Sequence, residues 1–181
     1  TKSTEPVSRL LDSQVINQIE DNIARYYTVD NQLQSLPFNS STPVLYYNKS
    51  LVEKLGLKTL PEDPSYQDIL NLAQAITEKT NHQTKGMTIE AYGWLFEELT
   101  ANQNQLLANH DNGRESGQYA TKININTPAA RRLMTFMKQA IQDKSFVSYG
   151  SGDIAEANQQ TAFLAGKLGM FMQSSASTGD L

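Results

Sequence analysis

The sequence predicts an α/β domain in which helices pack around a β-sheet. Segments with the apolar pattern of strands alternate along the chain with segments that repeat apolar residues at helical spacing. The composition is that of a globular protein: of 181 residues, 39% are apolar and 19% are charged, with 10 Gly and 6 Pro. A chain of this length buries roughly 70% of the surface that its unfolded form exposes, so one hydrophobic core can form without metals or disulfides.

The first 50 residues have the pattern of one helix followed by one strand. Behind Pro6, apolar residues recur at every fourth position, which predicts an amphipathic helix over residues 7–27. Residues 44–47 read Val-Leu-Tyr-Tyr and carry apolar or aromatic side chains on both faces. A short run of this kind is typical of a strand buried in a sheet.

The middle of the chain repeats this alternation. Ser65, with Asp68 three positions later, resembles a capping box, and the apolar spacing that follows predicts a helix through Ile76. Residues 86–89 are expected to form a strand, and residues 94–107 a further helix. The inner face of that helix is expected to carry Leu95, Leu99 and Leu106.

A loop, a strand and a helix follow. Residues 109–117 are polar and contain two glycines, which predicts an exposed loop. Residues 121–126 alternate between polar and apolar side chains, as a half-buried strand does. Thr127 can cap a helix and Pro128 suits its first turn, and apolar residues then recur at helical spacing. We therefore expect a helix from Pro128 onwards.

The chain closes with one more helix and one more strand. Asp153, with Glu156 three positions later, is typical of a helix start. Gly166 stands where a left-handed residue ends such a helix. Residues 168–173 are expected to form the last strand.

Charge and residue usage exclude several function classes. Fifteen Lys and Arg against 19 Asp and Glu give a net charge of −4, which offers no attraction to a nucleic acid. The absence of Cys excludes thiolate nucleophiles, Cys-ligated zinc and disulfides. The only histidines, His82 and His110, lie in polar segments without the spacing of a metal site. The sequence therefore predicts a protein that is not an enzyme and that uses no cofactor or metal.

Three clusters are candidates for ligand binding. Ser40 and Ser41 belong to a run of small polar residues before the strand at 44–47, and Ser174 and Ser175 follow the strand at 168–173. Donors at strand ends often face a cleft in α/β proteins, although the first run can equally form an ordinary turn. Trp94, the only tryptophan, can stack on a ligand or fill the core. In a structural or adhesive domain these clusters would be buried or scattered.

One stretch has a specific family resemblance. Residues 37–49 read Pro-Phe-Asn-Ser-Ser-Thr-Pro-Val-Leu-Tyr-Tyr-Asn-Lys, and further matches are Gly93-Trp94 and the run from Phe163 to Met170 that leads into Ser174-Ser175. On these residues the chain resembles the extracellular solute-binding proteins of family 1 that feed ABC importers, and within them the members that bind glycerol 3-phosphate. The resemblance covers nearly the whole chain.

This resemblance implies one lobe of a type II periplasmic-binding-protein fold, with helices packed around a mixed β-sheet. Residues 1–32 would be a helix and turn of the first lobe, and residues 33–43 the crossing between lobes. Residues 44–169 would form the second, C-terminal lobe, and residues 170–181 the start of a truncated return crossing. Because family members are longer and have two lobes, we expect the chain to be a fragment.

The resemblance also implies a function. The protein would be the substrate-binding component of an ABC importer, capturing glycerol 3-phosphate or a glycerophosphodiester by closing two lobes and delivering it to a membrane permease. A sugar- or oligosaccharide-binding protein of the same family is the alternative. The ligand contacts implied are Ser41 in preference to Ser40, together with Trp94, Ser174 and Ser175. The expected location is the periplasm or the cell surface as a lipoprotein, with the signal segment absent from this chain.

Overall fold

The computed structural model describes residues 5–90 and 92–181. The described residues up to Ser40 and Leu106–Ile125 form one compact unit, here the first unit. Ser41–Gln105 and Asn126–Leu181 form the second unit. Residues 106–125, which the predicted boundaries assign to the second lobe, are part of the first unit. The lobe boundaries themselves stay a prediction.

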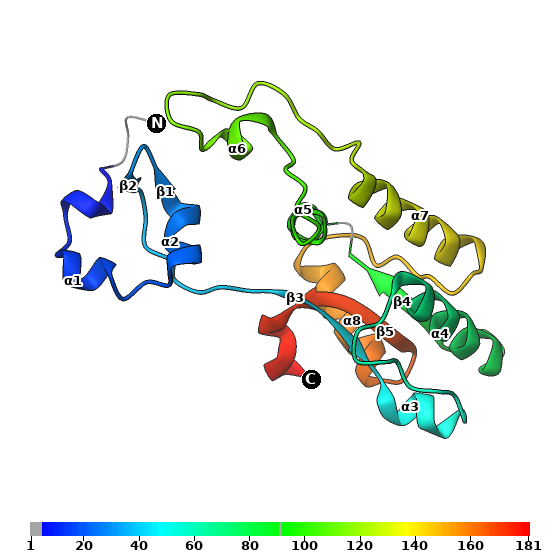
Figure 1. The fold of residues 1–181 in the computed structure, drawn as a ribbon. Coiled ribbons are helices and arrows are strands. Elements are labelled where there is room, and N and C mark those ends of the chain that lie inside the picture. The colour runs from blue at the N-terminus through cyan, green and yellow to red at the C-terminus, as the bar shows by residue number, and fades with distance from the viewer. Residues whose placement is uncertain (1–4, 91) are drawn as a thin grey trace. The chain divides into compact units, whose positions relative to one another are not determined.

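The second unit is built on a three-stranded mixed sheet (Figure 1). Its strands are β3 (Pro43–Tyr47), β4 (Lys85–Ile89) and β5 (Leu168–Ser174), in the order β3-β5-β4. The central strand β5 pairs antiparallel with β3 and parallel with β4. Beyond β4, Phe146 adds a parallel bridge. Strands were predicted at all three positions, but β3 is a half-buried edge strand and not the fully buried strand that was expected.

Helices pack around this sheet, as predicted. They are α3 (Lys49–Lys54), α4 (Tyr66–Lys79), α5 (Gly93–Ala101), α7 (Pro128–Gln142) and α8 (Asp153–Leu164), with the 3₁₀ helix η2 (Ser175–Asp180) at the end. Helix α4 contacts β4, α8 contacts β5, and α7 packs against both α4 and α5. Between them lies one hydrophobic core, whose fully buried members include Ile76, Met87 and Met170.

Local signals explain where the long helices start and stop. Ser65 and Asp68 form the predicted capping box of α4, and the Thr127 side chain accepts a hydrogen bond from the Ala130 N–H at the start of α7. After α8, Gly166 adopts a left-handed φ of +67°, as the sequence indicated. No described helix has both the length and the apolar character needed to cross a bilayer.

The first unit consists of short elements. They are η1 (Val7–Arg9), α1 (Ser13–Ile16), α2 (Asp21–Tyr27), β1 (Thr28–Val29), β2 (Gln32–Leu33) and α6 (Asn109–Gly113). The single helix predicted over residues 7–27 is therefore wrong. Asp12 caps a new helix by accepting a hydrogen bond from the Gln14 N–H. The apolar stripe is only partly covered: η1 and α2 contact β2, but Val15 remains 45% exposed.

Two further predictions fail for a related reason. Helix α5 ends at Ala101, so Leu106 lies outside it and is 48% exposed. The strand predicted at residues 121–126 is reduced to one bridge between Ile123 and Ala108, and Ile123 is 79% exposed. Alternation favours a strand only where a sheet offers a face to cover, and no described element covers this one.

Candidate functional site

The candidate site lies at one edge of the second unit's sheet. Because β4 and β5 are parallel, both end at this edge, and the antiparallel β3 begins there. Three segments therefore meet: Glu90 after β4, Ser174 and Ser175 at the end of β5, and Ser41-Thr42 before β3. We call these residues, together with Gln173 and Gly152, the serine edge.

Hydrogen bonds join the two serine clusters, which are more than 130 positions apart in the sequence. The Thr42 N–H donates to the Ser175 Oγ at 3.2 Å, and the Ser175 N–H donates to the Thr42 carbonyl at 2.8 Å. In the strand register, Pro43 lies opposite Ser174. The structure thus brings Ser41 close to Ser174 and Ser175, and all three are half-buried. Ser40 is exposed and belongs to the first unit.

The serine hydroxyls at this edge keep their donor capacity. The Ser174 Oγ accepts a hydrogen bond from the Ala176 N–H at 3.1 Å, and the Ser175 Oγ accepts from Thr42. A hydroxyl that accepts from an N–H can still donate its own proton. Within the described part of the chain, neither O–H donates to a protein group, and the Ser41 side chain makes no hydrogen bond. Three hydroxyl donors are therefore available for a ligand oxygen.

A buried carboxylate underlies the edge, and sequence reasoning missed it. The Glu90 Oε2 accepts a hydrogen bond from the Gln173 Nε2 at 2.9 Å, and its Oε1 accepts from the Gly152 N–H at 2.7 Å. The Gln173 Oε1 in turn accepts from the Ser174 N–H at 2.8 Å. Glu90 thus links the end of β4, the end of β5 and the start of α8. The only sequence signal was an acidic residue directly after the apolar strand that ends at Ile89.

Trp94 packs against the core and is also partly accessible. It is the second residue of α5, it is half-buried, and it packs against the hydrophobic core. Its ring lies 5.8 Å from that of Tyr92, with the planes tilted by 43°. Helix α5 contacts β3, whose first residue follows Thr42. Core packing therefore fixes the indole while part of its surface stays accessible. Ala91, which precedes Tyr92, lies outside the described residues.

The loop of residues 148–152, next to the serine edge, contains the phenol of Tyr149 and no Lys, Arg or His. Residues 148–152 lead into α8, and burial raises the pKa of Tyr149 in this loop above its usual value of 10.0. A neutral phenol can both donate and accept a hydrogen bond. Gly152 has a φ of +84°, a conformation that glycine adopts readily and that presents its N–H to Glu90.

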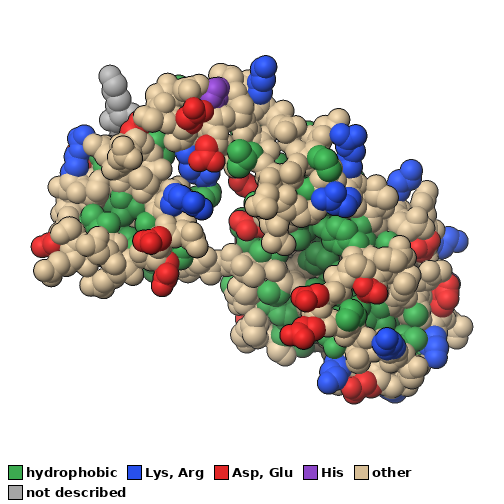
Figure 2. Space-filling view, viewed as in Figure 1, with side chains coloured by type: hydrophobic (Ala, Val, Ile, Leu, Met, Phe, Trp, Pro, Cys, Tyr) green, Lys and Arg blue, Asp and Glu red, His purple; other side chains and the backbone are tan. Residues whose placement is uncertain are grey.

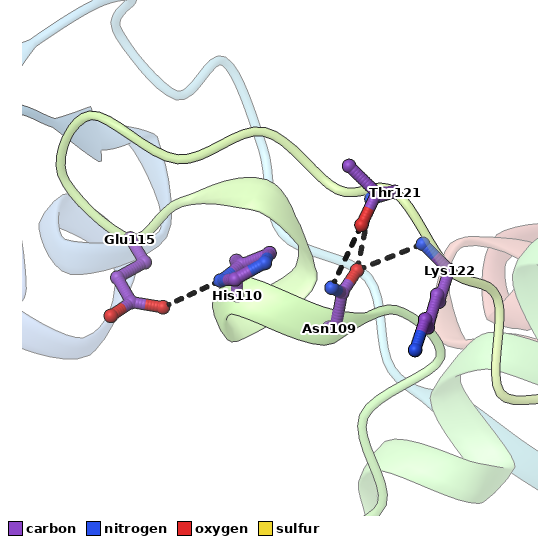
Figure 3. Close-up of polar contacts among 5 residues, drawn as sticks. All are labelled: Asn109, His110, Glu115, Thr121 and Lys122. Carbon is purple, nitrogen blue, oxygen red and sulfur yellow. Dashed lines mark hydrogen bonds and ion pairs between the residues drawn. The ribbon is translucent and has the colours of Figure 1, made fainter.

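The polar cluster around His110 has the geometry of a turn and not of a catalytic or metal site. In the first unit, the His110 Nδ1 lies 3.0 Å from the Glu115 Oε2, and Asn109 bonds to Thr121 and Lys122 (Figure 3). Over residues 5–90 and 92–181, no three His, Asp or Glu side chains are grouped as metal ligands. Figure 2 shows Lys and Arg scattered among Asp and Glu on the face it presents, so that face carries no basic patch.

Comparison with known proteins identifies a family. The family model for bacterial extracellular solute-binding proteins matches residues 4–180. The chain is 29% identical over 160 residues to the sn-glycerol-3-phosphate-binding periplasmic protein UgpB of Agrobacterium fabrum, which covers 88% of this chain and 35% of that protein. It is 30% identical over 161 residues to UgpB of Rhizobium meliloti. This match covers 88% of this chain and 36% of that protein. The chain thus spans about a third of the length of these relatives.

Solved structures share the fold. The GacH receptor of Streptomyces glaucescens, studied unliganded and with acarbose, matches with a TM-score of 0.72 and 20% identity over 98% of this chain and 42% of that one. UgpB from Mycobacterium tuberculosis, in complex with glycerophosphocholine, matches with a TM-score of 0.66 and 14% identity over 98% of this chain and 43% of that one. These likenesses confirm the predicted fold class.

Proposed function

Because the chain belongs to the bacterial extracellular solute-binding protein family, we propose that it is part of the substrate-binding component of an ABC importer. The whole protein captures a small polyhydroxylated solute outside the cytoplasm and delivers it to a membrane permease. Glycerol 3-phosphate or a glycerophosphodiester is one candidate ligand, and a sugar or oligosaccharide is the other. The protein is either free in the periplasm or held at the cell surface as a lipoprotein.

The observation that carries the proposal is the convergence of Ser41, Ser174 and Ser175 at one sheet edge, with their O–H groups free to donate. Each neutral hydrogen bond contributes on the order of 1 kcal/mol net, so a polyol gains affinity from several weak contacts. The accessible part of Trp94 offers an apolar surface to the C–H groups of such a ligand. No covalent chemistry is required.

Affinity in this proposal depends on closure of two lobes around the ligand. Only a closed form lets both walls contact the ligand at once, so binding shifts the population towards that form. The second unit supplies one wall. The other lobe supplies the other wall.

Each candidate ligand has its own support. The UgpB relatives carry glycerol 3-phosphate in their names, which favours the phosphate. The serine edge contributes hydroxyls and a carboxylate, and its segments contain no Lys or Arg, which favours an uncharged sugar. Ligand titration of the intact protein that contains this chain separates the two.

The test uses two variants and a control. Trp94→Ala is expected to weaken a ligand that stacks on the indole by about 1–2 kcal/mol. A double change of Ser174 and Ser175 to Ala is expected to weaken a phosphate by a larger factor than a neutral sugar, since anionic oxygens gain more from these donors. The control is Ser50→Ala, an exposed serine on α3 at the opposite end of β3.

Calorimetric titration at fixed ionic strength gives the result. A larger loss for glycerol 3-phosphate than for maltose supports the phosphate, and equal losses support the sugar. Binding that neither Trp94→Ala nor the double serine variant changes would remove the serine edge from the ligand site. Failure of the unmodified protein to bind any solute would reject the function itself.

A further inference from the structure

We infer that buried Glu90 makes the serine edge select uncharged polyhydroxylated ligands over phosphate monoesters. The inference rests on the proposed function of this edge and narrows the class of ligand. Glu90 is only 7% exposed, and both of its oxygens accept hydrogen bonds from N–H donors, the pattern of a carboxylate. None of the ion pairs among the described residues includes it.

The carboxylate occupies the position where a helix would otherwise attract an anion. Gly152 is the N-cap residue of α8, a 12-residue helix, and its N–H donates to the Glu90 Oε1 at 2.7 Å. Free N–H groups and the helix dipole favour negative charge at this end of a helix. Because the protein's own carboxylate already accepts from Gly152, a ligand phosphate meets a negative charge there in place of an unshared donor.

Gln173 connects Glu90 to the serine donors by hydrogen bonds. Gln173 donates to the Glu90 Oε2 and accepts from the Ser174 N–H, so two hydrogen bonds separate the carboxylate from the backbone of Ser174. The Gln173 side chain is buried, which keeps water from screening this path. A dianion held by Ser174 and Ser175 would therefore be repelled by a weakly screened charge.

The segments around Glu90 contribute negative charge only. The segments that form or flank the edge, residues 41–43, 90–94, 148–156 and 173–181, contain no Lys, Arg or His. They contain four acidic residues, Glu90, Asp153, Glu156 and Asp180. An uncharged polyol is not repelled by these charges. Its hydroxyl oxygens can accept hydrogen bonds from the serine O–H groups just as phosphate oxygens can. The edge is therefore built for hydroxyl recognition.

A purely structural role for Glu90 predicts a different result. If the carboxylate only fixed Gly152 and Gln173, its loss would weaken charged and uncharged ligands by the same factor. A role in selectivity changes the ratio of the two affinities. That ratio is the quantity to measure.

The experiment titrates the intact protein that contains this chain with sn-glycerol 3-phosphate at pH 8 and with glycerol, mannitol, maltose and laminaribiose. We expect the unmodified protein to bind at least one uncharged probe at least tenfold more tightly than the phosphate. Glu90→Gln should shift the ratio at least tenfold towards the phosphate, about 1.4 kcal/mol. Glu53→Gln makes the same change in net charge on α3, at the opposite end of β3, and should leave the ratio unchanged.

A second variant covers the case in which Glu90→Gln does not fold. Asp153→Asn removes an exposed charge at the start of α8 and breaks no side-chain hydrogen bond to the described residues, so it should shift the ratio the same way by a smaller factor. Tighter binding of glycerol 3-phosphate than of every uncharged probe, or an unchanged ratio in the folded variants, overturns the inference and leaves the proposed function standing. Failure to bind any probe rejects both.

Discussion

Different interactions stabilise the interior of each compact unit. The second unit surrounds β5 with a hydrophobic core, and Met170, Phe171 and Leu168 of that strand are fully buried. In the first unit only Pro6 and Leu33 are buried among the described residues. Its contacts include polar ones on exposed residues, such as the pairing of Arg114 with Tyr26 and the bonds of Asn109 in Figure 3.

This difference relates packing to the proposed ligand-binding role of the second unit. A buried central strand holds the serine edge in one arrangement, because moving it would disturb the whole core. Polar contacts on an exposed loop contribute less and open locally at lower free energy. We therefore expect substitutions around β5 to change global stability and substitutions in the first unit to act locally.

The largest expected effect follows from Phe171→Ala. The ring is fully buried, stacks on Tyr46 with centroids 4.9 Å apart and meets Phe163 edge-on at 5.1 Å. Its removal should lower the free energy of unfolding by about 3–5 kcal/mol. Urea denaturation measures the loss. Tyr119→Ala, which truncates an aromatic ring that is 87% exposed in the first unit, should change it by less than about 0.5 kcal/mol. Similar losses for the two variants would contradict the comparison.

A smaller but still global effect is expected for Gly169→Ala. A Cβ at this position of β5 would lie 2.7 Å from the Ile76 Cδ1 and 2.9 Å from the Gly86 carbonyl oxygen, both closer than ordinary contact. Overpacking of this kind costs about 1–3 kcal/mol. Gly179→Ala is the control, since a Cβ there meets no atom within 4 Å. The midpoint of thermal unfolding should be lower for Gly169→Ala than for Gly179→Ala. Equal midpoints would show that β5 can shift to make room for the added Cβ.

Elements with local signals were predictable from the sequence. Helices α4 and α7 combine a side-chain cap with an apolar stripe that a sheet or a helix covers, so both start where predicted to within one residue. The stripe over residues 7–27 is as regular, but the described residues cover it only in part, and Asp12 starts a new helix inside it. A periodic stripe identifies the face that would be buried and cannot supply the partner that buries it.

The candidate site was predictable only in part, for a similar reason. Hydroxyls at strand ends marked Ser41, Ser174 and Ser175, and the strand pairing brings them together. Glu90 was missed because its partners Gly152 and Gln173 lie 62 and 83 positions away in the sequence. A single acidic residue after a strand has no distinctive spacing. Only the fold shows that both of its oxygens are used.

A local effect is expected for Asn109→Ala in the first unit. The Asn109 Oδ1 accepts from the N–H groups of Thr121 and Lys122, both at 2.9 Å, and its Nδ2 donates to the Thr121 Oγ1 at 3.1 Å. Losing these exposed bonds should cost about 1 kcal/mol. Hydrogen exchange at those two amides should quicken about fivefold, while the global unfolding midpoint stays unchanged. Asn124→Ala, in the same segment, removes no side-chain bond and serves as the control. A shift of the global midpoint would show that the two units unfold together.

The smallest effect concerns acid and the capping box of α4. The Ser65 Oγ and N–H donate to the Asp68 Oδ2 at 2.5 and 2.9 Å, and these bonds hold the pKa of Asp68 below its usual value of 3.8. A folded-state pKa below the unfolded one adds stability that is complete above the unfolded pKa and is lost as the pH falls through the folded pKa. The stability difference between the unmodified chain and Asp68→Asn should therefore be constant from pH 7 to about 5 and shrink below pH 4.

Urea titrations at each pH measure this difference, with Asp63→Asn as the control because its side chain makes no hydrogen bond to the described residues. Because Ser65 is exposed, solvent screens the pair, and the gain should be smaller than the losses at β5. A difference that grows on acidification would have the wrong sign for a carboxylate stabilised in the folded state. A difference that does not change with pH would mean that α4 is held by its packing against β4 and α7 with no contribution from the charged cap.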